Sequence, residues 1–198
     1  MTNDGVNKGR RRFLVAATSV VGAAGAVGAA VPFIASWNPS AKAKAAGAPV
    51  KVNLAKIESG QQIIAEWRGK PVFVVRRTPE ILENIKQLNS RVADPESTEE
   101  SQQPSYAKNE FRSIKPEILV LVGLCTHLGC SPKFFPEVKP MEFDQEWKGG
   151  YHCPCHGSKF DLAGRVFKSV PAPINLQVPP YSFIDDNTLI IGVDEESA

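Results

Sequence analysis

Two short stretches decide the fold: CTHLGC at residues 125–130 and CPCHGS at residues 153–158. Together they contain all four cysteines of the chain and two of its three histidines, and the third, His152, immediately precedes the second stretch. Each stretch places one thiol and one imidazole at chelating distance, and each carries a further cysteine. This concentration of sulfur and nitrogen ligands in two narrow windows indicates a metal site.

Three kinds of site would use these ligands. A zinc finger also takes two cysteines and two histidines, but it groups the cysteines together and the histidines together, whereas each stretch here mixes the two types. Two disulfides in an oxidising compartment would use every cysteine but would leave His127 and His156 without a role. A [2Fe–2S] cluster with two cysteines on one iron and two histidines on the other uses both residue types. The mixed pattern therefore favours the cluster.

The two stretches resemble the ligand boxes of the family of Rieske iron–sulfur subunits of ubiquinol–cytochrome c reductase. The resemblance continues through KFD at 159–161, AGR at 163–165 and PAPINL at 171–176. It is dense across about residues 118–192 and looser upstream. It implies an all-β head, a Rieske-type antiparallel β-sandwich with a small cluster-binding subdomain at about 118–176.

The resemblance also implies a role for each side chain of the two boxes. Cys125 and Cys153 would be ligands of the buried iron. His127 and His156 would be ligands of the outer iron. Cys130 and Cys155 would form a disulfide between the boxes. Soluble Rieske ferredoxins and the Rieske domains of ring-hydroxylating oxygenases generally lack this extra pair, so it points to the quinol-oxidising branch.

His127 and His156 are expected to be catalytic groups as well as ligands. Two neutral imidazoles in place of two thiolates leave the oxidised site nearly neutral, so that an added electron meets less repulsion and the potential rises. Reduction makes the site negative and favours protonation of the imidazoles, which couples electron uptake to proton uptake. A ligand histidine on an exposed iron can therefore accept hydrogen from a quinol.

Two neighbouring positions are expected to tune the potential. In the family, a serine placed like Ser158 donates a hydrogen bond to a cluster sulfide, and a tyrosine two positions later donates to a ligand sulfur. Ser158 is thus predicted to be a cofactor-binding residue. This chain has Phe160 at the tyrosine position, so we expect a lower potential than in tyrosine-bearing relatives. Leu128 and the segment 171–173 are expected to cover the cluster, with core packing as the alternative for Leu128.

Composition agrees with a loop-rich β-protein. The chain contains 16 prolines and 15 glycines, which argue against a helical bundle. Its length of 198 residues allows one domain of ordinary size plus extra segments. The formal net charge of +2 comes without a basic, aromatic-interleaved patch, so we expect no nucleic-acid partner. Residues 93–110 are acidic and poor in apolar side chains, which predicts a solvated loop. Short β-runs are predicted at 50–54, 62–67, 71–76, 118–124, 181–184 and 188–193, with a helix from Pro79 to about Leu88.

The N-terminal part predicts an exported, membrane-anchored protein. Residues 1–12 are polar and would form a cytoplasmic segment, and RRRFL at 10–14 looks like a twin-arginine export signal. Residues 13–37 carry no charge and would span about 37 Å as a helix, enough to cross a bilayer core. The alternatives are an ordinary positive-inside anchor and a cleaved signal peptide. We expect an uncleaved anchor, because the apolar run exceeds the length of a typical signal segment.

The remaining boundaries follow from composition and from the resemblance. Residues 38–49, rich in alanine and lysine with Pro39 and Gly47, predict a linker, which the family implies is a flexible hinge. Residues 50–198 would form the [2Fe–2S] domain in the periplasm. The protein would thus lie in a bacterial inner membrane as a single-pass subunit.

The expected function is electron transfer within ubiquinol–cytochrome c reductase. The cluster would take one electron from ubiquinol, with a proton received by a ligand histidine, and pass it to a membrane-bound c-type cytochrome. The expected partners are the cytochrome b subunit, the c-type cytochrome, ubiquinol at the cytochrome b interface, and membrane lipid. The alternative is the Rieske small subunit of a periplasmic molybdenum oxidase such as arsenite oxidase, which would wire electrons without contact with quinol.

Overall fold

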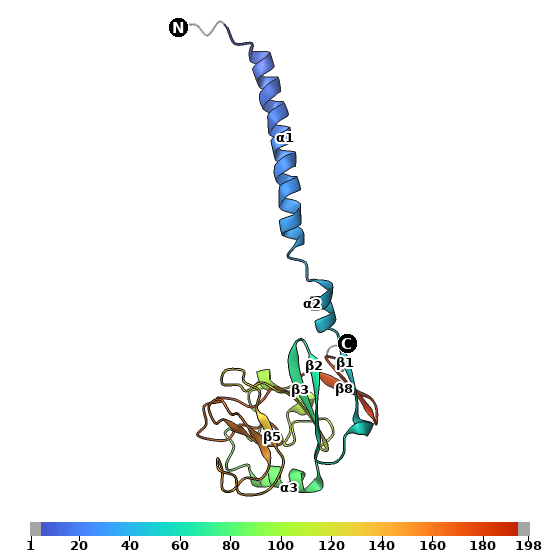
Figure 1. Cartoon of the computed structure of the whole chain (residues 1–198), viewed down its shortest axis with the longest axis vertical. Coiled ribbons are helices and arrows are strands. Elements are labelled where there is room, and N and C mark those ends of the chain that lie inside the picture. Colours follow the sequence, from blue (N-terminus) through green and yellow to red (C-terminus); the bar gives the residue numbers. More distant parts are fainter. Residues whose placement is uncertain (1–4, 194–198) are drawn as a thin grey trace. The chain divides into compact units, whose positions relative to one another are not determined.

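The computed structural model describes residues 5–193, in which the chain divides into two compact units, Met1–Ala45 and Ala46–Ala198. The first four residues of the predicted cytoplasmic segment and the last five residues of the predicted head lie outside the described residues. Figure 1 shows the helices and strands of both units.

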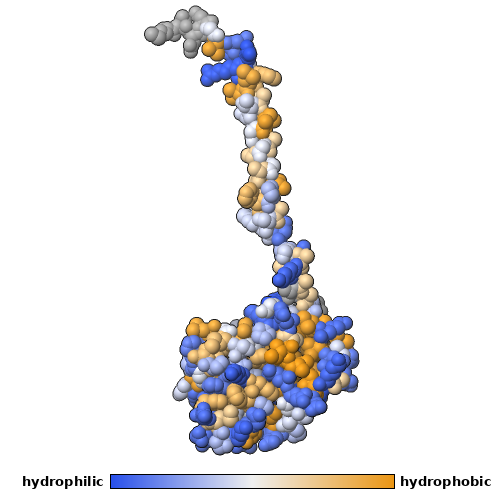
Figure 2. All heavy atoms as spheres, viewed as in Figure 1, coloured by the Kyte–Doolittle hydropathy of each residue, from blue (hydrophilic) through white to orange (hydrophobic). Residues whose placement is uncertain are grey.

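The first unit contains the long helix α1, Lys8–Ala35. The side chain of Asn7 caps its first turn by accepting a hydrogen bond from the Arg10 backbone N–H at 3.1 Å. None of its residues is buried, and even large apolar side chains such as Phe13 and Phe33 are 71% and 72% exposed. Figure 2 shows hydrophobic colours along α1 and hydrophilic ones near its start. Exposed apolar surface of this extent is stable in lipid rather than in water.

The structure extends the helix beyond the predicted span at one end and shortens it at the other. The predicted segment was 13–37, whereas the helix begins at Lys8, where Asn7 supplies the cap, and ends at Ala35, with Ser36 as its C-terminal cap. At 28 residues and about 1.5 Å per residue, α1 is long enough to cross a bilayer core. Within the predicted hinge 38–49, a second short helix, α2, spans Ala41–Ala46.

Up to residue 193, where the described part of the chain ends, the second unit contains three small antiparallel sheets of three strands each. The first has the order β1-β9-β8 and consists of Val50–Asn53, Thr188–Ile191 and Tyr181–Asp185. The second has the order β2-β3-β4 and consists of Gln62–Trp67, Lys70–Arg76 and Ile118–Val122. The third has the order β5-β6-β7 and consists of Lys133–Phe135, Gly150–His152 and Lys159–Phe160. The all-β antiparallel head predicted from sequence is confirmed. The first two sheets are called the base below.

The base sheet β2-β3-β4 is specified by its turn and its apolar strands. Arg68 and Gly69 have φ values of +52° and +69°, which suits a two-residue hairpin between β2 and β3. β4 is buried along its whole length, as its unbroken run of Ile, Leu and Val predicts. The sequence placed β4 at the start of the cluster-binding segment 118–176; the structure pairs it with β3, so the separate sheet of that segment begins at Lys133.

Between β3 and β4 the chain is mostly irregular. It contains α3, Pro79–Gln87, capped by Thr78, and the 3-10 turns Glu100–Gln102 and Ser105–Ala107; another 3-10 turn, Leu54–Lys56, follows β1. The region 93–110, predicted as a solvated loop, is partly buried. The Gln103 amide donates to the Ser97 and Glu99 carbonyls, and the Arg112 guanidinium donates to the Gln103 side-chain oxygen at 3.0 Å. A local composition signal cannot show such anchoring.

A buried ion pair fastens the turn that follows β7. Asp161 and Arg165 both have fully buried side chains, with 2.7 Å between Asp161 Oδ2 and Arg165 Nε. Asp161 Oδ1 also accepts from the backbone N–H groups of Ala163 and Arg165. The Arg165 guanidinium also donates hydrogen bonds to the carbonyl of Ile85 in α3 and to the side-chain oxygen of Asn89. One side chain therefore ties the cluster-binding segment to α3 and the residues that follow it.

We predict that Asp161→Asn lowers the free energy of unfolding by about 3–5 kcal/mol, because it leaves the Arg165 charge buried without a counter-ion. Urea unfolding of the purified protein measures this. Glu83→Gln is the control: it removes the exposed pair Glu83–Lys86 and is expected to cost at most about 0.5 kcal/mol. Equal effects of the two substitutions would contradict the assignment of Asp161 as the structural anchor.

Candidate metal centre

The two cysteine–histidine loops have the same backbone pattern. In the first, the Cys125 N–H donates to the Cys130 carbonyl and the Gly129 N–H donates to the Cys125 carbonyl, at 2.8 and 2.9 Å. In the second, the Cys153 N–H donates to the Ser158 carbonyl and the Gly157 N–H donates to the Cys153 carbonyl, also at 2.8 and 2.9 Å. The two glycines have φ values of +81° and +76°. This left-handed conformation favours glycine, which explains a glycine near the end of each loop.

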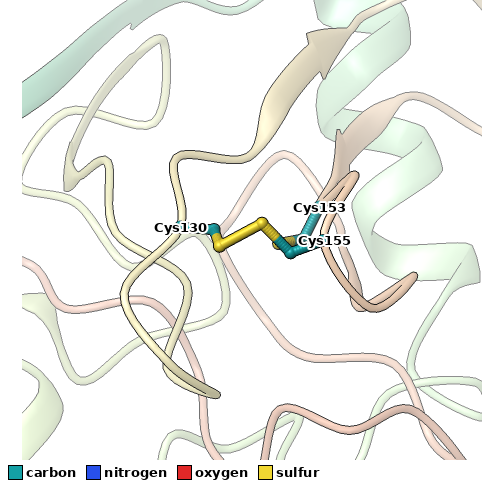
Figure 3. Close-up of side chains that lie close together, drawn as sticks. All are labelled: Cys130, Cys153 and Cys155. Carbon is teal, nitrogen blue, oxygen red and sulfur yellow. A yellow bond between two sulfur atoms is a disulfide. The ribbon is translucent and has the colours of Figure 1, made fainter.

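A disulfide joins the loops. It connects Cys130 and Cys155, whose Cα atoms are 6.6 Å apart, across 25 positions of sequence. The bond confirms the predicted pairing, and Figure 3 shows it bridging two separate loop segments. Because the crosslink limits how far the loops can separate, the residues that flank it stay face to face.

The two remaining cysteines carry free thiols and are buried. Cys125 is 3% exposed and Cys153 is 1% exposed. The pKa of the Cys125 thiol is raised, chiefly by burial and also by the neighbouring Cys153 sulfur. Hydrogen bonds from the His127 backbone and the Ser158 hydroxyl lower this pKa but do not cancel the rise. A positive metal is what would make thiolates favourable at this place.

The two imidazoles lie together at the outer end of the loops. The ring centroids of His127 and His156 are 4.7 Å apart, with the rings nearly perpendicular. His127 is half-buried, and its Nδ1 atom is enclosed without a hydrogen-bond partner. His156 is exposed. A buried ring nitrogen without a partner is costly in a folded protein, and a metal ion at that nitrogen would satisfy it.

The arrangement of the donor atoms does not match a site for a single metal ion. A tetrahedral zinc ion with bonds of about 2.0–2.3 Å holds its ligand atoms about 3.3–3.8 Å apart. Among residues 5–193, the group of three or more potential ligand atoms found within 4.8 Å of one another is that of Cys130, Cys153 and Cys155. Two of these sulfurs belong to the disulfide, so this trio is no thiolate site. The free thiols and the imidazoles are spread more widely than one ion needs, which fits a two-iron cluster.

A third loop, residues 171–176, lies next to the site and is hydrogen-bonded to both boxes. The Thr126 hydroxyl donates to the Ile174 carbonyl at 2.6 Å, and the Ala172 N–H donates to the Ser158 Oγ atom at 3.0 Å. This agrees with the predicted cover by residues 171–173. Leu128, by contrast, is 72% exposed. Core packing of Leu128, the alternative from sequence, is therefore wrong.

His152, the third histidine, has a different environment. Its ring stacks on Phe143 with centroids 4.0 Å apart. Burial lowers its pKa, and the positive charges of Lys159 and Lys133 lower it further. No role was predicted for His152, and its aromatic packing supports a structural one.

Sequence reasoning missed the ionic network beside the second box. Asp144 has a 4% exposed side chain and accepts from Arg91 and from Lys159 at 2.7 and 2.8 Å. Although burial raises the pKa of Asp144, these hydrogen bonds hold it below its usual value. Because Lys159 directly follows Ser158, Asp144 fixes the strand that leaves the second box. Its sequence context, an irregular proline-rich segment, carries no signal of this role.

Comparison with known proteins agrees with this geometry. Residues 98–180 match the family model described as "Rieske [2Fe-2S] domain", and residues 1–40 match "Ubiquitinol-cytochrome C reductase Fe-S subunit TAT signal". The chain is 58% identical over 198 residues to the "Ubiquinol-cytochrome c reductase iron-sulfur subunit" of Allochromatium vinosum, covering 100% of this chain and 95% of that protein.

More distant proteins are also similar. The protein of the same name from Blastochloris viridis is 41% identical over 191 residues, covering 96% of this chain and 97% of the relative. A chain of a solved structure titled "Hyperthermophilic respiratory Complex III" is 26% identical, with a TM-score of 0.48, and the match covers 89% of this chain and 99% of that one.

Fold and site together define a Rieske protein, whose cofactor is a [2Fe–2S] cluster. Because it is 58% and 41% identical to two such proteins over nearly its whole length, the chain belongs to the family of ubiquinol–cytochrome c reductase iron–sulfur subunits. It is thus a subunit of an oxidoreductase, and helix α1 with this membership indicates anchoring in a membrane. The alternative of a molybdenum-oxidase subunit is not favoured by these relatives.

We predict that removing the disulfide with Cys130→Ser and Cys155→Ser together weakens retention of the cluster. Loss of a crosslink that closes 25 residues costs about 3.5 kcal/mol in the chain-entropy model. The visible absorption of the cluster is expected to disappear at a lower urea concentration than in the wild type. Ser131→Ala, beside the crosslink, serves as control and should leave the midpoint unchanged. An unchanged midpoint in the double variant would refute the bracing role.

Proposed function

We propose that Cys125, His127, Cys153 and His156 hold the [2Fe–2S] cluster, the cysteines on the inner iron and the histidines on the outer one. The observation that carries this assignment is the pairing of two buried free thiols with two adjacent imidazoles, one of them with its Nδ1 enclosed and without a partner. Two loops of identical backbone pattern supply one residue of each type. When bound, the cluster supplies a one-electron acceptor.

The imidazoles are proposed to handle the proton that accompanies the electron. With Nδ1 directed inward, the Nε2 atom of His127 is the nitrogen left for an outside partner, and His156 is the more exposed of the two rings. A neutral imidazole can accept a hydrogen bond from a quinol hydroxyl and then its proton. His127 and His156 would thus be the catalytic residues, while the third loop and the buried cysteines exclude water from the inner side.

The partners follow from the family. We propose that the chain works beside a cytochrome b subunit, which binds ubiquinol at the interface with the head, and passes the electron to a membrane-bound c-type cytochrome. Helix α1 would lie in lipid of a bacterial inner membrane, with residues 1–12 in the cytoplasm and residues 50–198 in the periplasm. The basic residues Arg10, Arg11 and Arg12 support this orientation. Residues 38–49 would serve as the hinge, with α2 as one of its conformations.

Single substitutions of the four proposed ligands test the assignment. In membranes of the host strain, Cys125→Ala and Cys153→Ala are expected to abolish both the electron paramagnetic resonance signal of the cluster and the reduction of cytochrome c by ubiquinol. The same loss is expected for His127→Ala and His156→Ala. His152→Ala is the matched control, a third histidine next to a ligand but stacked on Phe143, and should retain the signal. A normal signal in any of the four ligand variants would overturn this ligand set.

We also predict opposite shifts of the reduction potential from two tuning positions. Ser158→Ala removes a hydroxyl that is fully buried beside the thiols and should lower the potential by roughly 60–130 mV, the equivalent of a hydrogen bond to a charged group. Phe160→Tyr adds a hydroxyl and should raise it. Redox titration monitored by circular dichroism of the cluster measures both. A potential that does not rise in Phe160→Tyr would count against the role given to that position.

A further inference from the structure

A free thiol lies directly beside the disulfide. The Sγ atoms of Cys130, Cys153 and Cys155 are all within 4.8 Å of one another. Figure 3 shows the Cys153 side chain next to the bond that joins the other two sulfurs. Cys153 is 1% exposed and unpaired, whereas Cys155 is exposed and Cys130 is half-buried. The arrangement places a free thiol within 4.8 Å of both sulfurs of a disulfide.

We propose that a chain that has lost its cluster undergoes an internal thiol–disulfide exchange, in which Cys153 attacks Cys130 and the Cys130–Cys155 bond is replaced by Cys130–Cys153. The proposal rests on the proposed function, in which Cys153 is a ligand of the cluster. While its sulfur is bonded to iron it is not available for attack. Loss of iron frees it next to its target.

The exchange needs no external reagent. A bond forms between the sulfurs of Cys153 and Cys130 as the bond between Cys130 and Cys155 breaks, and the electron pair of the broken bond leaves on the Cys155 sulfur. The proton given up by Cys153 ends on Cys155. One disulfide and one thiol are present among these three residues before and after, so nothing is oxidised or reduced overall.

Geometry selects Cys130 as the sulfur attacked. Only Pro154 separates Cys153 from Cys155, and a disulfide between them would close a very small ring against the usual Cα–Cα spacing. Bringing Cys153 and Cys130 from at most 4.8 Å to a bond of about 2.05 Å is within the reach of side-chain rotation. The leaving group, Cys155, lies on the exposed side of the loop and departs into solvent.

The consequence is a chain that has lost the capacity to rebind its cofactor. The new crosslink still joins the two loops, but it uses up one of the two proposed cysteine ligands. Cluster loss would therefore become permanent without any unfolding, and it would expose a reactive thiol at Cys155. The cluster and the disulfide protect each other: the disulfide braces the loops around the cluster, and iron keeps Cys153 away from the disulfide.

The first test uses the full-length, cluster-loaded protein in detergent, without oxygen. Iron is removed with a chelator, free thiols are blocked with N-ethylmaleimide at intervals, and unreduced peptides are sequenced by mass spectrometry. Fragmentation of the peptide that contains both Cys153 and Cys155 shows which of the two carries the alkyl group. We expect the group on Cys155, with loss of the original Cys130–Cys155 link. Label that stays on Cys153 a day after iron removal would overturn the proposal.

Two variants form a matched pair for the second test. Cys125→Ser and Cys153→Ser each lack one proposed cysteine ligand, but only Cys125→Ser keeps the attacking sulfur. We expect a Cys130–Cys153 link with alkylated Cys155 in the first, and an intact Cys130–Cys155 link in the second. The same pairing in both variants would contradict the mechanism. If Cys125→Ser does not fold, the chelated wild type decides.

Iron content and visible absorption of the starting protein report on the proposed function separately. A chain that never holds a cluster would refute that function, and the exchange would still be read in the iron-free chain. A normal cluster followed by unchanged pairing after chelation would refute the exchange alone.

Discussion

The constraint on which this structure depends is that two loops from distant parts of the chain must face each other at a fixed separation. Backbone hydrogen bonds fold each loop identically, and the Cys130–Cys155 disulfide fixes their mutual position. From that constraint follow the burial of two thiols on the inner side and the adjacency of two imidazoles on the outer side. A site with less fixed loops would bind metal only after paying for their ordering in conformational entropy.

The rest of the head holds this pair of loops in place. β4 pairs with β3 in the base and leads directly toward the first box, while β6 and β7 flank the second box. Asp161, Arg165 and Asp144 fasten the cluster-binding segment with buried ionic contacts. The third loop donates to and accepts from one residue of each box. Because several of these contacts, such as Arg91–Asp144 and Thr126–Ile174, join residues that are distant in sequence, the site is built on a rigid base rather than on local turns alone.

Much of this organisation was predictable from sequence. The proposed ligand residues could be selected because cysteine and histidine are rare and are confined to two windows, whereas the disulfide pair was implied by the resemblance of these windows to the family's ligand boxes. The strands of the base could be predicted because their apolar runs are short and bounded by turns. The burial around Gln103 was not predictable, since it depends on Arg112 and the fold around it rather than on the polar composition of residues 93–110. The Asp144 network was missed for the same reason: its partners, Arg91 and Lys159, are 53 and 15 positions away. The exposure of Leu128 likewise depends on where the loop tip lies.

Mixed sulfur and nitrogen ligation of two irons is the central claim. Mössbauer spectroscopy of the purified protein enriched in ⁵⁷Fe tests it most directly, because each iron site gives its own quadrupole doublet. The account predicts two irons per chain in equal amounts with different isomer shifts, and on reduction the added electron should reside on the histidine-ligated site. Two equivalent irons, or one metal ion per chain, would contradict it.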